Sequence, residues 1–303
     1  MPLVTSTEWL KKAQKEKFAI GAFNANNMEF IEAVIETAEE EKAPVFLQIS
    51  QGAIKYAGLE MATAMVRTAA ELASIPVILH LDHGTDFNQN VKCLRAGFTS
   101  LMFDGSALPF DENVKTTAKI AEIAHCCNIP IEAELGKVVQ SKDKLTQEQI
   151  EAVMTKPEES KKFIELTKCD SLAVAIGSVH AMKTRAARLD IERLKKIRQA
   201  VDTPLVLHGS SGVALDSIQE AIANGICKVN VATQLSMSFI KGCADALAIN
   251  PEETDMRKIL LPGKLAVKEK VREYIRVFGA CGKGIITGPV VSGLVKSEIK
   301  HAE

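Results

Sequence analysis

Residues 203–233 read TPLVLHGSSGVALDSIQEAIANGICKVNVAT and contain a strand, a helix and a second strand in succession. The short runs Leu205–His208 and Lys228–Val231, rich in Leu and Val, have the length of buried strands. Between them, Leu215–Ala223 places apolar side chains at the three- and four-residue spacing of an amphipathic helix. A strand, a crossover helix and a parallel strand form one βα unit, so this stretch predicts a parallel sheet covered by helices.

The same unit recurs along the chain, with strands starting about every 20 to 40 residues. The predicted strands are Ala19–Phe23, Val45–Ile49, Val77–Leu81, Ser100–Phe103, Ile129–Ala133, Ser171–Ala175, Leu205–His208 and Lys228–Val231. The helices expected between them include Glu29–Glu41, Glu60–Ala73, Asn113–Cys126, Pro157–Thr167, Ile191–Ala200 and Leu215–Ala223. Eight such units with right-handed crossovers close into a barrel, so we predict the α/β class and a (β/α)8 TIM barrel. An open doubly wound sheet is disfavoured because no GxGxxG follows the first strand.

Two segments interrupt the alternation. A long polar connection, Gly136–Met154, follows the fifth strand, and such loops in compact domains are often functional. After the last strand we predict two extra helices, near Gln234–Ala248 and Gly263–Phe278. No linker divides the chain, so the prediction is one barrel domain over residues 1–303, with 281–303 as a C-terminal tail.

The composition excludes several classes of function. The formal net charge is -1 with no long block of one sign, which argues against a nucleic-acid surface or a polybasic membrane patch. No apolar run reaches the roughly 18 residues of a membrane helix, and the start of the chain lacks the apolar core of a signal peptide. The seven cysteines are scattered without a CxxC pair, as expected for free thiols. We therefore predict a cytoplasmic protein without nucleic-acid or membrane partners.

Three of the six histidines occupy matching positions. His83, His180 and His208 each lie at or just beyond the end of a predicted strand, and Glu134 ends another. In a barrel these ends converge on the face that carries active sites. A lone histidine at a strand end is usually a hydrogen-bonded packing residue, but three imidazoles together form a recurrent catalytic zinc set. The sequence therefore favours a divalent metal site, most simply for zinc.

The remaining acidic and histidine residues near strand ends allow more than one interpretation. Asp82 precedes a candidate ligand and is predicted to be a general acid/base, with support of an imidazole as the alternative. Asp104 ends the fourth strand and is either a partner of the metal site or the cap of a turn. His80, three residues before the ligand of its strand, is expected on the other face and structural. His125 and His301 are not expected to be functional.

Small residues follow the last two strands. The turn in LHGSSGV (207–213) and the run KVNVAT (228–233) bring backbone N–H groups and a helix N-terminus to the usual phosphate site of a barrel. Side chains after the first two strands could add hydrogen bonds or merely cap helices. The predicted substrate and phosphate residues are Asn24, Ser50, Ala181, Gly209, Ser210, Ser211, Asn230, Ala232 and Thr233.

Taken in order, these motifs resemble the class II fructose-bisphosphate and tagatose-bisphosphate aldolase family. The resemblance covers about residues 1–280 and runs through AFN, LDHG, FDGS, EAELG, IGSVH, LHGSSG and KVNVAT. It implies a zinc-dependent lyase of carbohydrate metabolism that reversibly cleaves a ketose bisphosphate into dihydroxyacetone phosphate and an aldehyde through a zinc-stabilised enediolate. Fructose-1,6-bisphosphate is the foremost substrate, and the alternative is tagatose-1,6-bisphosphate, which Ala232 slightly favours, or another ketose phosphate. The resemblance further implies a homodimer or a homotetramer.

The resemblance also assigns roles by position. The zinc ligands it implies are His83, His180 and His208. Asp82 matches the acid/base that moves the proton of the substrate hydroxyl. Glu134 and Asp104 match the residues around an alternative metal position, hence a possible second site. The contacts to the ketose phosphate, beside which family members can bind a monovalent cation, are matched by Gly209, Ser211, Asn230 and Thr233.

Two positions depart from the family pattern. Lys142 stands where the mobile loop usually carries the Glu that exchanges the second proton, and a charged lysine has no acceptor. Asp143 remains beside it, and Glu148 or Glu151 could substitute if the loop folds differently. Ala181 replaces the usual glycine after the zinc histidine, which would strain a backbone with positive φ.

These departures leave two alternatives open. One is a non-catalytic barrel that binds metal and sugar phosphate, and the other is a metal-dependent sugar-phosphate isomerase or epimerase. Nearby, Lys183 or Arg185 could reach a phosphate or lie in solvent.

Overall fold

The computed structural model describes residues 3–140, 146–182 and 184–285. Its main sheet has eight parallel strands in the order β3-β2-β1-β10-β9-β7-β5-β4. Their bounds are β1 Ile20–Asn24, β2 Val45–Ser50, β3 Val77–Asp82, β4 Leu101–Phe103, β5 Ile131–Leu135, β7 Ser171–Val174, β9 Leu205–Leu207 and β10 Ile226–Val231. Parallel bridges His80–Ser100 and Gly84–Phe103 join the two outer strands, β3 and β4, and close the sheet. The predicted (β/α)8 barrel is confirmed.

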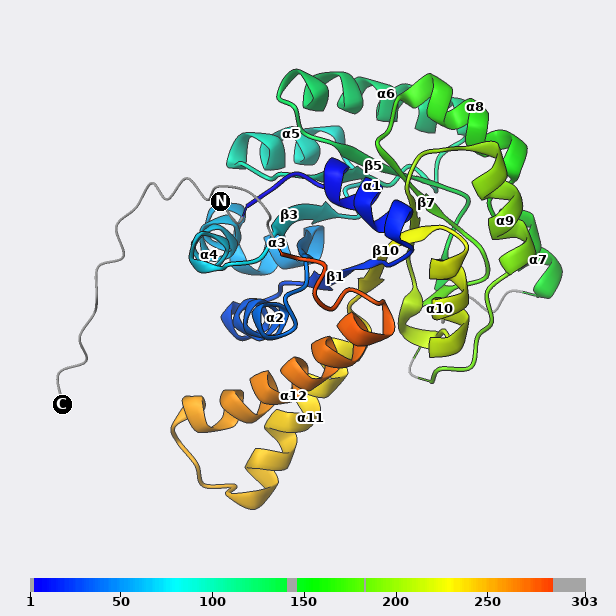
Figure 1. The fold of residues 1–303 in the computed structure, drawn as a ribbon. Coiled ribbons are helices and arrows are strands. Elements are labelled where there is room, and N and C mark those ends of the chain that lie inside the picture. Colours follow the sequence, from blue (N-terminus) through cyan, green and yellow to red (C-terminus); the bar gives the residue numbers. More distant parts are fainter. Residues whose placement is uncertain (1–2, 141–145, 183, 286–303) are drawn as a thin grey trace.

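Helices surround the barrel on its outside (Figure 1). Their bounds are α1 Thr7–Glu16, α2 Met28–Glu40, α3 Gln51–Ala57, α4 Leu59–Leu72, α5 Phe87–Ala96, α6 Phe110–Cys126, α7 Gln147–Val153, α8 Pro157–Thr167, α9 Ile191–Ala200, α10 Leu215–Ala223, α11 Thr233–Ile249 and α12 Met256–Val277. α1 lies at the N-terminal end of the strands, where Ser100 Oγ donates to Ser6 Oγ at 3.3 Å. The opposite, C-terminal end is thereby left for the site.

Most predicted elements lie within three residues of the observed ones. α8, α9 and α10 have the predicted bounds. The fifth strand starts two residues later than predicted, at Ile131, because Pro130 has no N–H for the ladder and Ile129 N still bonds Ala124 O at the end of α6. The polar connection after it contains a two-residue strand, β6 (Val139–Gln140), which pairs with β8 (Val179–His180), and also helix α7. It is therefore more regular than the sequence suggested.

The two C-terminal helices form a hairpin that projects from the barrel (Figure 1). α12 begins at Met256, seven residues before the predicted start, because Pro262 is accommodated within the helix. Opposite it, Gly242 of α11 allows a close approach, since a Cβ there would lie 2.6 Å from Pro262 O. The tail predicted from residue 281 is described only to residue 285, and its remainder lies outside the described residues.

A ladder of ion pairs joins α12 to α2. Basic residues recur at every fourth position of α12, so they share one face of that helix and meet the acidic face of α2. The pairs are Lys264 with Glu32 and Glu36, Lys268 with Glu36 and Glu40, Arg272 with Glu40 and Glu41, and Arg276 with Glu41. We call this set the α2–α12 ladder.

Candidate active site

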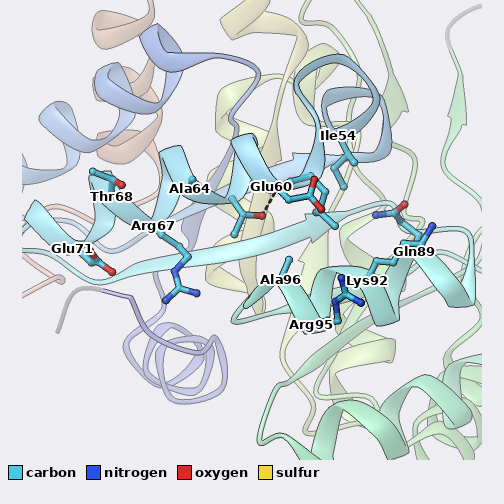
Figure 2. Close-up of a pocket in the computed structure, with 12 residues that line it drawn as sticks. Ile54, Glu60, Ala64, Arg67, Thr68, Glu71, Gln89, Lys92, Arg95 and Ala96 are labelled. Carbon is cyan, nitrogen blue, oxygen red and sulfur yellow. Dashed lines mark hydrogen bonds between the residues drawn. The ribbon is translucent and has the colours of Figure 1, made fainter.

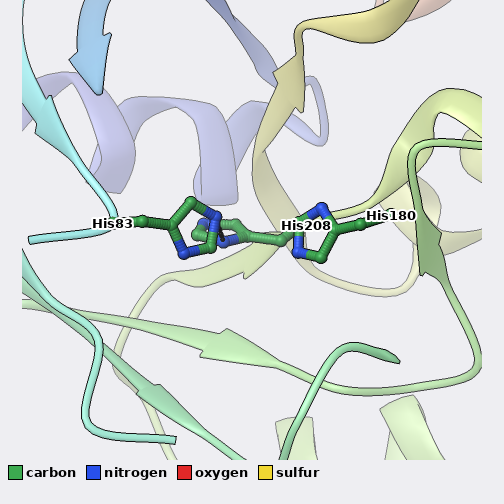
Figure 3. A group of neighbouring side chains, drawn as sticks. All are labelled: His83, His180 and His208. Atoms are coloured by element: carbon green, nitrogen blue, oxygen red, sulfur yellow. Dashed lines mark hydrogen bonds between the residues drawn. The ribbon is translucent and has the colours of Figure 1, made fainter. Parts of the chain in front are cut away.

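Three histidines meet at the C-terminal end of the barrel. His83 directly follows β3, His180 ends β8 and His208 directly follows β9. Their ring centroids lie 4.6 Å (His83–His208), 5.3 Å (His83–His180) and 6.4 Å (His180–His208) apart. Figure 3 shows the three rings grouped between the strands that carry them. One nitrogen of each lies within 4.8 Å of the others, which suits a single metal ion.

His83 reaches this position through an uncommon backbone conformation. Its φ is 48°, in the left-handed region that non-glycine residues seldom occupy. The next residue, Gly84, has no room for a side chain, because a Cβ there would lie 2.6 Å from Met102 O. The alternation of side-chain direction along β3 therefore ends at Asp82, and the His83 ring lies across the mouth of the barrel.

Two carboxylates adjoin the histidines. Asp104 Oδ2 lies 2.7 Å from His83 Nδ1, and Glu134 Oε2 lies 3.3 Å from His208 Nδ1 and 3.8 Å from His83 Nδ1. His83, Asp104 and Glu134 form a second group whose ligand atoms lie within 4.8 Å of one another. The predicted alternative position therefore has its donors assembled, and it shares His83 with the first.

The charges of this cluster favour a bound cation. Burial alone would lower the pKa of His83, but Asp82, Asp104 and Glu134 together raise it to about 10. Burial, together with the charges of His83 and His208, lowers the pKa of His180 to about 3, so that ring is neutral and can act as a ligand. Asp82, Asp104 and Glu134 thus surround the rings with carboxylates that a divalent ion would attract.

Asp82 is held between two amides. Its Oδ2 accepts a hydrogen bond from Asn24 Nδ2 and its Oδ1 one from Asn230 Nδ2, both at 3.0 Å. Gln48 Nε2 donates to Asn24 Oδ1 at 2.8 Å and so fixes the orientation of that amide. Burial would raise the pKa of Asp82, but the neighbouring His83 and His208 lower it below its usual value. The carboxylate is therefore ionised, rigidly placed and 3.9 Å from His83 Nε2.

A pocket of about 680 Å³ opens over this cluster. Its lining includes nearly all the residues predicted from the sequence: Asn24, Asp82, His83, Asp104, Glu134, His180, Ala181, Gly209, Ser210, Ser211, Asn230, Ala232 and Thr233. It also includes Gln48, Gln51, Thr85, Ser106 and Lys137, which the sequence did not single out. The predicted residues thus come together from seven different strand ends.

One end of the pocket is built from small residues. Gly209 has φ 66°, and a Cβ there would lie 3.1 Å from Val179 C and 3.2 Å from His180 N. It leads into a short 3-10 helix, Ser210–Gly212, and α11 begins nearby at Thr233 with no side chain capping its N-terminus. Open backbone N–H groups of this kind bind anions.

Predicted residues that do not line the pocket include His208, which is fully buried, Ser50 and Arg185. Ser50 Oγ accepts from Ala53 N at 3.2 Å and caps α3, while its neighbours Gln48 and Gln51 line the pocket instead. Arg185 donates to Glu273 Oε1 at 2.7 Å and to the Tyr274 hydroxyl at 2.9 Å, so it anchors its loop to α12.

The loop carrying the departure from the family pattern is only partly described. Lys142, Asp143 and Lys183 lie outside the described residues, as does His301. Glu148 is exposed, and Glu151 pairs with Arg193, so neither lines the pocket.

Ala181 has φ 59°, the positive value for which alanine is strained. His125 lies in the last turn of α6, where its Nε2 lies 2.8 Å from Asp170 Oδ2. His80 is fully buried, as expected of a structural residue, but it points into the barrel on the same side of β3 as Asp82, not to the other face. The error came from extending the strand alternation to His83, which lies beyond the strand.

A second hollow, of about 850 Å³, lies between α4 and α5 on the outside of the barrel (Figure 2). Arg67, Lys92 and Arg95 line it together with Glu60 and Glu71. It is larger than the pocket at the barrel mouth, but it contains no group of metal-ligating side chains among the described residues. Within the described part of the chain, the groups of side chains that could hold a metal lie at the barrel mouth.

Comparison with known proteins decides the family. The family model "Fructose-bisphosphate aldolase class-II" matches residues 4–283. This chain belongs to that family. The fructose-bisphosphate aldolase of Thermus caldophilus is 40% identical over 304 residues, covering 93% of this chain and 99% of the relative. That of Helicobacter pylori is 38% identical over 305 residues, with the same coverage.

Solved structures agree with this class II aldolase fold. The YdjI aldolase from Escherichia coli K12 superposes with a TM-score of 0.81 at 35% identity, covering 93% of this chain and 99% of that one. The fructose-bisphosphate aldolase of Campylobacter jejuni, at 23% identity and a TM-score of 0.79, shares the fold.

The activity of the class II aldolase family is cleavage that releases dihydroxyacetone phosphate, and zinc dependence is a family trait. The resemblance seen in the sequence is confirmed, as is the assignment to the lyases. None of the helices in the described part of the chain combines the length and apolarity needed to cross a membrane.

Proposed function

We propose that this protein reversibly cleaves a ketose bisphosphate, fructose-1,6-bisphosphate foremost, into dihydroxyacetone phosphate and an aldehyde. The observation that carries this proposal is the cluster of three histidines beside an ionised aspartate, at a pocket that is also lined by an anion-binding loop. Membership of the class II aldolase family supports it.

The donor set fits zinc. His83, His180 and His208 would hold the ion, leaving a position open for substrate, as in catalytic zinc sites. When bound, zinc supplies a Lewis acid that polarises the substrate carbonyl and offsets the negative charge left after the carbon–carbon bond breaks. Asp104 and Glu134, with His83, would form the second position, and a monovalent cation beside the phosphate loop remains part of the proposal.

Asp82 is the proposed base in the cleavage direction. It is an ionised carboxylate beside the metal cluster, and both of its oxygens are held by amides, so it can accept the proton of the substrate hydroxyl without moving. In the reverse direction the same oxygen returns the proton. Asn24 and Asn230 orient it, and Gln48 orients Asn24.

The small-residue end would hold the ketose phosphate. Gly209, Ser210 and Ser211 with the N-terminus of α11 at Thr233 offer backbone N–H groups, and Ser211 Oγ and Asn230 Oδ1 are buried without a partner among the described residues. Ala181 and Ala232 line the same end. Ser50 caps α3, so its proposed contact with the phosphate requires α3 to rearrange.

The first experiment is a coupled assay of triose-phosphate release. Fructose-1,6-bisphosphate and tagatose-1,6-bisphosphate are each offered to zinc-loaded and to chelator-treated protein. Zinc-dependent release supports the proposal and identifies the preferred epimer. Binding of both sugars without release would support a non-catalytic barrel, and a rearranged sugar phosphate would support an isomerase or epimerase.

A variant tests the role of Asp82. Asp82→Asn keeps the shape but removes the base, so kcat should fall by about 10²- to 10⁴-fold with zinc affinity retained. Asp86→Asn is the matched control, because Asp86 caps α5 outside the pocket and asparagine caps equally well. Unchanged turnover of Asp82→Asn would refute the assignment.

We further propose a homodimer or homotetramer assembled from one barrel domain per chain. Exposed apolar side chains on the projecting α11–α12 hairpin support this, among them Ile240, Ile249 and Met256. Light scattering of Ile240→Asp/Ile249→Asp should show a smaller assembly than the parent, and an unchanged mass would contradict this surface.

The protein is also proposed to be cytoplasmic. All seven cysteines are free thiols, three of them buried, which is the usual state in a reducing compartment.

A further inference from the structure

The two ring nitrogens of His208 face different surroundings. Nδ1 lies 3.1 Å from His83 Nε2, toward the metal cluster. Nε2 lies 2.8 Å from Glu132 Oε1, inside the barrel below the pocket, and the ring is fully buried. Only Nδ1 can therefore bind the ion, and it can do so only if the ring proton is on Nε2.

Glu132 is in turn held by a buried lysine. Lys228 Nζ lies 3.1 Å from Glu132 Oε1 and 2.9 Å from Oε2, and both side chains are essentially inaccessible to solvent. A lysine ammonium has three donors and no acceptor. Both oxygens of residue 132 must therefore accept hydrogen bonds on the side that faces Lys228.

The other side of Lys228 is equally constrained. His80 Nε2 lies 3.3 Å from Lys228 Nζ and must accept, because the lysine cannot. The His80 proton is then on Nδ1, which lies 2.8 Å from Ser100 Oγ. The Phe46 ring lies 5.3 Å from Lys228 Nζ. The hydrogen bonds that link Ser100 to His208, through His80, Lys228 and Glu132, therefore each have a single donor-to-acceptor direction.

We propose that Lys228, acting through Glu132, sets the tautomer of His208 and so presents Nδ1 to the metal. Both are positioning residues, since neither lines the pocket or belongs to a group of side chains that could hold the metal. Lys228 forces residue 132 to be an acceptor on both oxygens, and an acceptor at Oε1 requires the His208 proton on Nε2. This inference rests on the proposed metal site at His83, His180 and His208.

The first test needs no substitution. Long-range ¹H–¹⁵N spectra of protein labelled in its six histidines report which ring nitrogen carries the proton, with His208→Gln assigning the signals. In the zinc-loaded protein we expect His208 bound through Nδ1 with a slowly exchanging Nε2–H. Coordination through Nε2 would overturn the proposal. In the metal-free protein the Nε2–H is expected even if zinc does not bind, which separates failure of this inference from failure of the proposed function.

The second test reverses the hydrogen-bond pattern. In Glu132→Gln the single oxygen of the amide goes to Lys228, so its NH2 group faces His208 Nε2 and moves the ring proton to Nδ1. Zinc affinity, measured by chelator competition, should fall by about 10- to 100-fold. Affinity within threefold of the parent would overturn the role of Glu132.

Removing Lys228 should restore zinc binding to the Glu132→Gln variant. In Glu132→Gln/Lys228→Met no cation competes for the amide oxygen, which can again accept from His208 while the NH2 group turns to His80 Nε2, 3.9 Å from Glu132 Oε2 in the parent. The double variant should bind zinc at least threefold more tightly than Glu132→Gln and show the Nε2–H signal. Affinity no better than that of Glu132→Gln would overturn the role of Lys228.

Asp170→Asn is the matched control. It makes the same carboxylate-to-amide change beside a histidine, His125, but away from the pocket. Zinc affinity should be unchanged, and circular dichroism should show all variants folded. A loss in Asp170→Asn as large as that in Glu132→Gln would show that the effect is one of general stability and overturn the proposal.

Discussion

Replacing Gly209 with alanine should damage both stability and metal binding. Gly209 has φ 66°, where an L-residue costs about 1–2 kcal/mol. A Cβ there would also meet Val138 Cγ1 at 2.9 Å, Val179 C at 3.1 Å and His180 N at 3.2 Å. Two of these three atoms belong to backbone and cannot rotate away, so crowding adds about 1–3 kcal/mol. The expected loss in the free energy of unfolding is about 2–5 kcal/mol.

The chain offers a control with the same backbone and no crowding. Gly282 has φ 72° and nothing within 4 Å of the Cβ position. Gly282→Ala should therefore cost only the conformational part, about 1–2 kcal/mol. The difference between the two variants in urea unfolding of the metal-free protein isolates the crowding at Gly209.

The crowding has a functional consequence, because β8 carries His180. Relief of the clash requires β8 to move away from Gly209, so Gly209→Ala should bind zinc more weakly and raise KM for the sugar phosphate, while Gly282→Ala changes neither. Equal losses of stability in the two variants, or undiminished zinc affinity in Gly209→Ala, would refute the reasoning.

Three further predictions concern strain, metal and charge. Ala181→Gly should raise the free energy of unfolding by up to about 1 kcal/mol, because φ 59° no longer strains the backbone, and a loss in urea unfolding would contradict this. Chelation of zinc should lower stability by about 3 kcal/mol relative to protein in zinc at 100 times its Kd, and calorimetry showing no change in Tm would refute a bound ion. Lys268→Gln removes two ion pairs of the α2–α12 ladder and should lower the free energy of unfolding by about 0.5–1 kcal/mol. Lys241→Gln breaks one exposed ion pair and should lower it less. Equal losses in denaturant titrations would show that the ladder adds no stability.

The pocket was predictable to the extent that strand ends converge. The convergence of His83, His180 and His208 was predicted from position alone, because the C-terminal ends of parallel barrel strands meet whatever their exact register. Their separation in sequence, up to 125 residues between His83 and His208, is no obstacle to this rule. The rule places side chains at the mouth but says nothing about which nitrogen of a ring faces the proposed metal.

Contacts that depend on register were not predictable. Asn24 and Gln48 touch because they are register partners on β1 and β2, a relation that no local pattern reveals. The sequence led instead to Ser50, whose hydroxyl serves equally well for binding and for capping, and the structure uses it to cap α3. The signal that could have identified Gln48 is its place among apolar residues in the predicted strand VFLQI (45–49).

Lys228 is a still clearer case of a polar residue within a buried strand. A lysine inside a strand normally marks a solvated edge, yet β10 lies between β1 and β9 and Lys228 is fully buried. Placing an ammonium and a carboxylate out of water costs several kcal/mol, and an apolar pair of similar volume would fill the layer without that cost. Packing therefore gives no reason for Lys228 and Glu132 to occupy this layer. The proposed orientation of His208 does, because a donor-only cation next to a two-oxygen acceptor fixes the direction of the hydrogen bond that reaches this proposed metal ligand.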